Sequence, residues 1–328
     1  MAEPNENPSS QSGAGMPGEP HALQFSRDAA PRTFQERSHA IFLGPEGLRA
    51  GWRLLVYLFL VATLFFIAQV ILNSLHSLGS LRLIFFDKVL FVLEVTVPAF
   101  FLARMEQRPF SAYGLAARGI LRGNFWTGLL WGIGSVTLLI LLLRACHAYD
   151  FNGLAIHGQR LVKFALFWTA FFFLVALSEE FLLRGYTQFT LSGAIGFWPA
   201  AVLLSLMFGA IHIGNEGENW MGLLGVSIVG FFFCLTLRRT GNLWFAIGFH
   251  AAWDWGESYL YAVPDSGTIV PGHLLRATLH GSRFITGGTV GPEGSVLLLV
   301  VMAVTWIAFD RTHRQVNYPP TRSNAPCN

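Results

Sequence analysis

The chain has 328 residues, of which 53% are hydrophobic and only 12% are charged, and its formal net charge is +3. Soluble globular domains usually contain about 25% charged residues, so the composition excludes an ordinary soluble domain and indicates a protein with several membrane spans. A net charge this small gives no sign of a nucleic-acid partner. The three cysteines, Cys146, Cys234 and Cys327, lack the spacing of a zinc site or a disulfide framework.

Residues 1–40 are rich in Pro, Gly, Ser, Asn and Glu, which predicts a disordered cytoplasmic tail. Beyond them, apolar runs follow one another, and about 20 mostly apolar residues are enough to cross a bilayer as a helix. We therefore expect an all-α, multi-pass membrane domain over residues 41–315 and a short C-terminal tail over 316–328. The eight candidate spans are 54–72, 84–103, 126–143, 164–183, 198–213, 221–237, 243–263 and 295–309.

The lysines and arginines favour one orientation of these spans. If the N-terminus is inside, the inside segments hold more of them than the outside loops, which is typical of cytoplasmic segments. An even number of spans then places both termini in the cytoplasm and the long loop 256–294 outside, as a cap over that face. The inside set is Arg27, Arg32, Arg37, Arg49, Arg53, Arg104, Arg108, Arg118, Arg122, Arg184, Arg238, Arg239, Arg311, Arg314 and Arg322; the outside set is Arg82, Arg144, Arg160, Lys163, Arg276 and Arg283.

Two adjacent glutamates, Glu179 and Glu180, stand at the end of the apolar run 164–177. A carboxylate in hydrocarbon is costly, so it is rarely found there without a partner or a function. Glu180 and Arg184 are four residues apart, which lets them pair on one face of a helix. Glu179 points about 100° away from Glu180 on a helix, and it is left free to accept a proton.

Histidines occupy similarly unusual places in two later apolar segments. The motif Phe208-Gly-Ala-Ile-His212 ends one segment, and we expect Phe208 to pack and shape a cavity. In the other, His250 and Asp254 are one helical turn apart, so both can face one cavity, and a carboxylate near an imidazole can fix its tautomer. With Glu179, these groups could activate a water and stabilise an oxyanion, as peptide hydrolysis requires.

These three motifs, EExxxR, FxxxH and HxxxN/D in that order on hydrophobic segments, resemble the CPBP family. This family comprises CAAX-type prenyl-protein endopeptidases and bacteriocin-processing enzymes, and is also called Abi. The resemblance covers about residues 164–263, and residues 286–295 are similar to a stretch in some bacterial members. It implies an intramembrane endopeptidase of eight helices in a bacterial plasma membrane, with a cavity open to the cytoplasm. Its partners would be membrane lipids and a membrane-associated peptide or lipidated protein substrate.

The resemblance also implies a role for each motif residue. Glu179 with His212 would activate the water, and His250 with the residue at position 254 would form the oxyanion site. Many members have Asn where this chain has Asp254, and an ionised Asp cannot donate to an oxyanion. Asp254 is therefore protonated, or orients His250, or ligates a metal. The supporting residues are Glu180, Arg184 and Phe208.

Metal dependence is open on the residues alone. Two histidines with carboxylates make a zinc-like set, but no HExxH motif is present. We favour a glutamic protease without a cofactor, because members of the family are described as such. If the enzyme depends on a metal, zinc would be held by Glu179, His212, His250 and Asp254.

Other interpretations of these residues remain open. The glutamate pair could cap the cytoplasmic end of a span, His212 could bond a backbone carbonyl at a helix end, and His250 with Asp254 could form a structural clamp. The protein could then be a catalytically silent scaffold of the same fold. It could also be a proton-coupled transporter in which Glu94 and Glu179 relay protons, although Glu94 is interpreted first as a contact between helices.

A count of residues raises one geometric difficulty. At 1.5 Å per residue, the predicted span ends place Glu179 and His250 in the cytoplasmic half of the bilayer and His212 in the outer half. The three groups can meet only if the helices tilt or if the predicted boundaries are wrong by a turn or two.

Overall fold

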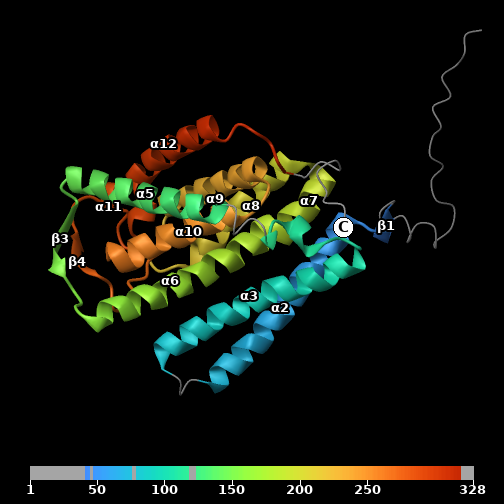
Figure 1. Ribbon diagram of the computed structural model, residues 1–328, viewed down its shortest axis with the longest axis horizontal. Coiled ribbons are helices and arrows are strands. Elements are labelled where there is room, and N and C mark those ends of the chain that lie inside the picture. The colour runs from blue at the N-terminus through green and yellow to red at the C-terminus, as the bar shows by residue number, and fades with distance from the viewer. Residues whose placement is uncertain (1–40, 45–46, 76–78, 118–122, 319–328) are drawn as a thin grey trace, which may run out of the picture.

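A computed structural model describes residues 41–44, 47–75, 79–117 and 123–318. Figure 1 shows long helices that lie roughly side by side, with α2 and α3 forming a pair along one flank of the bundle. The helical fold predicted from the sequence is confirmed. The predicted tail 1–40 lies outside the described residues, as do residues 319–328 of the predicted C-terminal tail.

The longer helices in chain order are α2 (Ala50–Ser74), α3 (Ser80–Met105), α5 (Asn124–Ala145), α6 (Gln159–Glu180), α7 (Gln188–Ile195), α8 (Phe197–Ile211), α9 (Trp220–Thr240), α10 (Trp244–Trp255) and α12 (Val296–Thr312). Two π-helical stretches, η3 (Phe181–Thr187) and η5 (Gly256–Leu260), continue α6 and α10. The shorter elements are η2 (Phe110–Tyr113), η4 (His212–Gly214), α11 (Arg283–Thr286), η6 (Pro292–Gly294) and the strands β1 (Leu43–Gly44), β2 (Gly47–Leu48), β3 (Tyr149–Leu154) and β4 (Leu275–Leu279).

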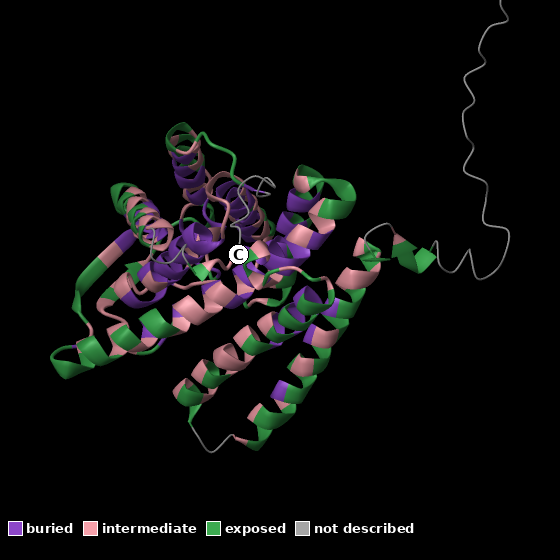
Figure 2. Ribbon diagram, turned by 45° about the vertical axis from the view of Figure 1, so that its right-hand side comes forward, coloured by how far each residue is buried: buried purple, intermediate pink, exposed green. Residues whose placement is uncertain are grey.

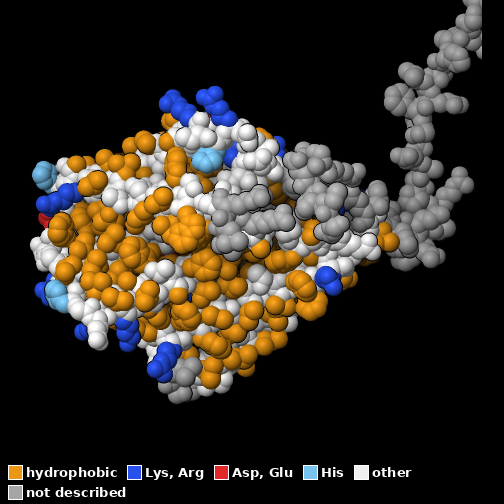
Figure 3. Space-filling view, viewed as in Figure 1, with side chains coloured by type: hydrophobic (Ala, Val, Ile, Leu, Met, Phe, Trp, Pro, Cys, Tyr) orange, Lys and Arg blue, Asp and Glu red, His pale blue; other side chains and the backbone are white. Residues whose placement is uncertain are grey.

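Among the described residues, five helical segments are long and apolar enough to cross a membrane: Ala50–Ser74, Asn124–Ala145, Gln159–Ile195, Phe197–Gly214 and Trp220–Thr240. Helix α3 has charged residues spread along its length (Arg82, Asp87, Lys88, Glu94 and Arg104), and α10 and α12 are shorter. The structure therefore confirms several membrane spans, whereas the count of eight and the orientation of the termini stay predictions. Figure 3 shows hydrophobic side chains spread over the flank of the bundle, as expected for a surface that faces lipid.

One residue used to predict the orientation was assigned to the wrong environment. Arg184 was counted with the cytoplasmic segments, but its side chain is fully buried in the bundle. The helix does not end there, because η3 and α7 carry it on to Ile195. The charge of Arg184 is balanced inside the protein and says nothing about which side of the membrane is cytoplasmic.

Helices α5 and α10 touch through their backbones. A side chain on Gly128 or Gly132 of α5 would overlap the carbonyl oxygen of Phe245 or Phe249 on α10, and Gly248 meets α5 in the same way. Small residues allow such close approach between membrane helices. Figure 2 shows buried residues gathered in the body of the bundle and exposed residues along the α2–α3 pair. Helix α10 is thus fixed in the buried core.

This contact predicts a stability difference between two glycines of one helix. We expect Gly132→Ala to lower the free energy of unfolding by about 1–3 kcal/mol, because overpacking forces the backbones apart. Gly134 has open space around it, so Gly134→Ala is the matched control and should leave stability unchanged or slightly raised. Thermal unfolding of both variants in detergent measures the difference; equal melting temperatures would contradict the close contact.

The long loop 256–294 is anchored at one end of the bundle. Its strand β4 pairs antiparallel with β3, which follows α5, with Tyr149 opposite Leu279. Figure 1 shows this ribbon at the end of the molecule where α6 begins. The loop continues through α11 and η6 into α12, so it is folded against the bundle at the end where α10 finishes.

Candidate active site

The pair predicted between Glu180 and Arg184 is present at the junction of α6 and η3. Arg184 Nη1 lies 3.2 Å from Glu180 Oε1, and both side chains are fully buried. The guanidinium also lies 4.4 Å from the centre of the Phe208 ring, at a distance typical of a cation–π contact. Phe208 therefore packs as predicted, and the π-helical turn sits where such turns are often found, beside a functional site.

Glu180 makes a second contact that the sequence did not predict. Its Oε1 lies 3.1 Å from His250 Nδ1 on α10. A carboxylate that is paired with an arginine accepts hydrogen bonds, so Nδ1 carries a proton and donates it to Glu180. The opposite nitrogen, Nε2, lies 3.4 Å from Asp254 Oδ2 and 3.9 Å from Glu179 Oε2. Glu180 thus orients His250, a role for which the sequence analysis considered only Asp254.

His212 follows directly after α8 and bonds to the helix end. Its Nδ1 lies 2.7 Å from the backbone oxygen of Phe208. Because a carbonyl can only accept, Nδ1 is the donor, and in the neutral ring Nε2 keeps a lone pair that can accept a proton. The bond from His212 to a backbone carbonyl at a helix end, which the sequence analysis kept as an alternative, is therefore present. The same bond leaves Nε2 of His212 free to accept a proton.

The four predicted catalytic side chains line one cavity of about 470 Å³: Glu179, His212, His250 and Asp254. Glu180 and Arg184 lie behind this wall, fully buried. The count of residues had placed His212 in the other half of the bilayer from Glu179 and His250, but in the structure the three side chains line the same cavity. The side chain of Glu179 is 24% exposed, against 0% for Glu180, so the first glutamate faces the cavity and the second faces the protein. Glu94 is buried in α3 and is not among the lining residues in the described part of the chain.

The cavity extends to one end of the bundle. Its lining outside the long helices includes His212 and Asn215 after α8, residues of the loop 265–271, and Glu293 before α12. All of these lie where α8 and α10 end and α9 and α12 begin. If both termini are cytoplasmic, this end lies on the outer side. An opening of the cavity at this end would therefore agree with only one of two expectations, the predicted cytoplasmic termini or the cytoplasmic opening implied by the resemblance.

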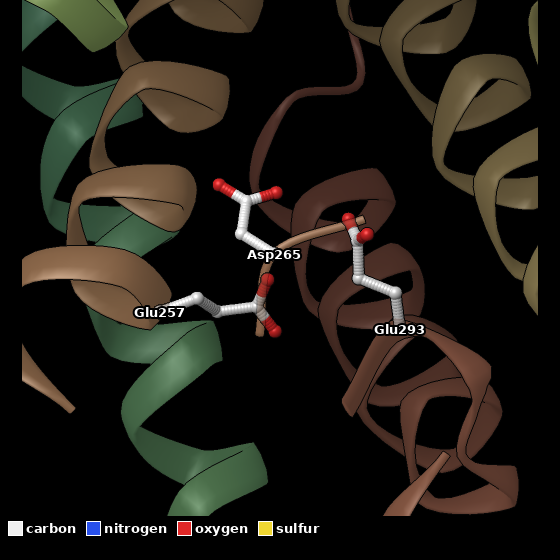
Figure 4. A group of neighbouring side chains, drawn as sticks. All are labelled: Glu257, Asp265 and Glu293. Atoms are coloured by element: carbon white, nitrogen blue, oxygen red, sulfur yellow. The ribbon is translucent and has the colours of Figure 1, made fainter. Parts of the chain in front are cut away.

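Sequence reasoning assigned no role to three acidic residues at this end, Glu257, Asp265 and Glu293, which lie close together (Figure 4). Burial, followed by the negative charges of Asp254 and Glu293, raises the pKa of Asp265 well above its usual range. The signal available in the sequence was weak, since each acid lies singly in a Gly- or Pro-rich stretch. Within the described residues, these three, rather than the catalytic four, have ligand atoms close enough to hold an ion.

Fold and cavity together define a multi-pass membrane protein with a buried acid–histidine site. Residues 161–256 match the family model described as type II CAAX prenyl endopeptidase Rce1-like. The match runs from α6 to the beginning of η5 and contains all three motifs, so the family predicted from those motifs is confirmed for this segment. At the family level it supports a CAAX-type intramembrane endopeptidase and an integral membrane location. No curated protein matches the chain.

Proposed function

We propose that the chain is an intramembrane endopeptidase that cleaves membrane-associated peptide or lipidated protein substrates with a water activated by Glu179. One observation carries this proposal: Glu179, His212, His250 and Asp254 come from three helices and line one cavity. The segment that holds them is also the segment that matches a family of membrane proteases. A silent scaffold would not need these groups around one space.

The reaction follows from the proton-accepting and proton-donating atoms. Glu179 takes a proton from the water while the water oxygen attacks the peptide carbonyl carbon, and the electrons of the C=O π bond move to oxygen. His212, with Nε2 open as an acceptor, helps to position the water. Protonated His250 donates from Nε2 to the oxyanion while its Nδ1 stays bonded to Glu180. The oxyanion then reforms the carbonyl, the C–N bond breaks, and Glu179 returns its proton to the leaving amine.

Asp254 lies beside the donating nitrogen of His250. In this mechanism its negative charge stabilises the imidazolium, and its place at the cavity wall leaves the donor role to His250. Asn at this position would instead donate directly to the oxyanion. The presence of Asp in this chain is therefore compatible with hydrolysis, because the charged histidine supplies the hydrogen bond.

A metal-free mechanism is proposed because, among the described residues, the catalytic four do not supply three ligand atoms within 4.8 Å of one another. The histidines themselves do not decide the question: Nδ1 of His250 is bonded to Glu180 and Nδ1 of His212 to a backbone carbonyl, which leaves Nε2 of each ring open to a proton or a metal. The alternative, zinc held by the catalytic four, predicts stoichiometric zinc in the purified protein and loss of activity with 1,10-phenanthroline. Metal analysis of the purified chain and inhibition by this chelator distinguish the two mechanisms.

The test of the proposal is cleavage by the purified full chain in liposomes. A panel of fluorogenic peptides, with and without a farnesyl or acyl chain, should include substrates that are cut only in the presence of the protein. In water enriched in ¹⁸O, mass spectrometry should find one heavy oxygen in each new carboxyl group, because the nucleophile is water. If no peptide of the panel is cut, or if cleavage leaves no heavy oxygen, the proposed hydrolase is wrong.

The side on which the cavity opens is tested with cysteines that the chain already has. Cys146 is exposed and Cys234 is buried, and Cys146 lies at the end of α5, next to the ribbon that anchors the long loop. With both termini inside, a membrane-impermeant maleimide should label Cys327→Ser protein in intact cells through Cys146. The Cys146→Ser protein should be labelled only after permeabilisation, through Cys327. The reverse pattern would place the cavity mouth in the cytoplasm.

A further inference from the structure

Three carboxylates outside the catalytic set gather at the cavity wall. Glu257 belongs to η5, Asp265 to the loop that follows, and Glu293 to η6. One oxygen atom from each can be chosen so that no two are more than 4.8 Å apart. Figure 4 shows Glu257 reaching from its helix toward the other two side chains. Asp265 and Glu293 line the cavity, so the cluster borders the space in which substrate would bind.

Glu257 is the unusual member of this group. The residue is completely buried, and neither carboxylate oxygen has a hydrogen-bond partner among the described residues. The side chain of Trp253 lies near enough to interact with the carboxylate, but not at ordinary hydrogen-bond geometry. A buried carboxylate without partners is costly, so Glu257 points to a ligand that the protein itself does not provide.

The other two carboxylates are held in place through one oxygen each. Ser258 Oγ donates to Asp265 Oδ2 at 2.9 Å, and Ser266 donates to Glu293 Oε2 from its backbone nitrogen at 3.0 Å and its hydroxyl at 2.7 Å. Hydrogen bonds of this kind commonly orient carboxylates that bind metals. The second oxygen of Asp265 and of Glu293 makes no hydrogen bond within the described part of the chain.

The backbone brings the acids together without help from opposite charges. Gly267 N donates to Val290 O at 2.9 Å, and a side chain on Gly291 would overlap the carbonyl oxygen of Pro264. These contacts join the loop of Asp265 to the turn of Glu293. In the described residues, no lysine or arginine forms an ion pair with any of the three acids. Like charges held this close repel one another unless a proton or a cation lies between them.

We propose that Glu257, Asp265 and Glu293 bind one divalent cation, with Ca²⁺ as the best fit. Carboxylate oxygens favour hard cations over zinc or copper. The three oxygens lie within 4.8 Å of one another, which is close enough for one ion to contact all three. Ca²⁺ is preferred over Mg²⁺ because Mg²⁺ usually keeps several waters and binds through only one or two carboxylates, whereas Ca²⁺ accepts several carboxylates in a flexible geometry. Ca²⁺ takes 6–8 oxygen ligands, so water completes the set.

The cation would have a structural task. It would join η5, the loop of Asp265 and η6, and so fix one wall of the candidate active site. The site does not rest on the proposed function, because none of its three residues takes part in the hydrolysis. If the protein binds the cation but cleaves no peptide, the cation site is supported and the proposed hydrolysis is contradicted.

The experiment uses the purified full chain in detergent after removal of metals. Mn²⁺ is the probe, because it accepts the same oxygen ligands and its free form is counted by electron paramagnetic resonance. We expect one bound Mn²⁺ per chain, displaced by Ca²⁺, and a melting temperature that rises with Ca²⁺ concentration. Glu257→Gln and the isosteric Asp265→Asn should each weaken Mn²⁺ binding at least tenfold. Glu216, an exposed acid on the loop after α8, supplies the control Glu216→Gln, which should bind as the wild type does.

The wild-type stoichiometry needs no variant, so the test does not depend on how a variant folds. Absence of bound Mn²⁺ at neutral pH would show that protons neutralise the cluster and would overturn the proposal. Unchanged binding in Glu257→Gln would also overturn it. If Glu179→Gln no longer binds Mn²⁺, the ion lies at the catalytic set and the proposal is wrong. If Glu179→Gln binds Mn²⁺ as the wild type does, the proposal is supported.

Discussion

Replacing Glu179 by Gln is expected to reduce kcat for peptide cleavage by about 10³-fold, within the 10²–10⁴-fold range of general base catalysis. The amide keeps the size of the side chain but cannot take a proton from water. KM should change little, because Glu179 acts on the water and not on the ground-state substrate. Kinetics with the best peptide of the liposome panel measure both constants.

The same variant should fold as well as the wild type. Glu179 is 24% exposed and its ion pair with His250 Nε2 is long, at 3.9 Å, so its loss should destabilise the chain little. Glu216→Gln, at an exposed position, should keep full activity. If Glu179→Gln retains more than about a tenth of wild-type kcat, Glu179 is not the base, since general base catalysis contributes at least about 10²-fold.

Breaking the buried pair should have the largest effect on stability. Glu180→Met leaves the charge of Arg184 without its carboxylate at a site with no exposure, and Arg184→Met leaves Glu180 bonded to His250 but without the arginine. Single changes that break a buried pair cost about 3–5 kcal/mol. The double variant should recover much of this loss, because an apolar pair of similar volume leaves no buried charge. Chemical unfolding of the two single variants and the double variant in detergent measures the coupling.

Stability and activity should separate in the double variant. It lacks the carboxylate that holds His250 Nδ1, so its cleavage rate should stay at least about 10²-fold below wild type, the scale expected for a misplaced catalytic group. A positioning role of Glu180 thus predicts a stable but poorly active protein. Additive losses of stability in the double variant, or full recovery of activity, would argue against the paired arrangement.

The contacts that the sequence predicted correctly lie within single helices. Glu180 with Arg184, and His250 with Asp254, are four residues apart, and the helical repeat places such residues on one face wherever the helix lies. The membrane character followed from composition for a similar reason, since it depends on length and hydrophobicity alone. These properties are local, and the structure bears them out.

The contacts that were missed join different helices. The bond from His250 to Glu180 depends on how α10 packs against α6, which no spacing within one segment reveals. Arg184 was placed at a cytoplasmic boundary because an arginine after an apolar run usually marks one, whereas here a buried partner retains it. The acids Glu257 and Glu293 lie near opposite ends of the long loop 256–294, and only the folding of this loop brings them together.

The glycine contacts between α5 and α10 have a consequence for turnover. Helix α10 carries His250 and Asp254, and its backbone rests against that of α5 without intervening side chains. A helix seated this tightly cannot rotate to meet an incoming peptide. In the proposed reaction, the scissile bond would therefore be delivered to a stationary imidazole, and discrimination between substrates would depend on which peptides unwind and extend far enough to reach it.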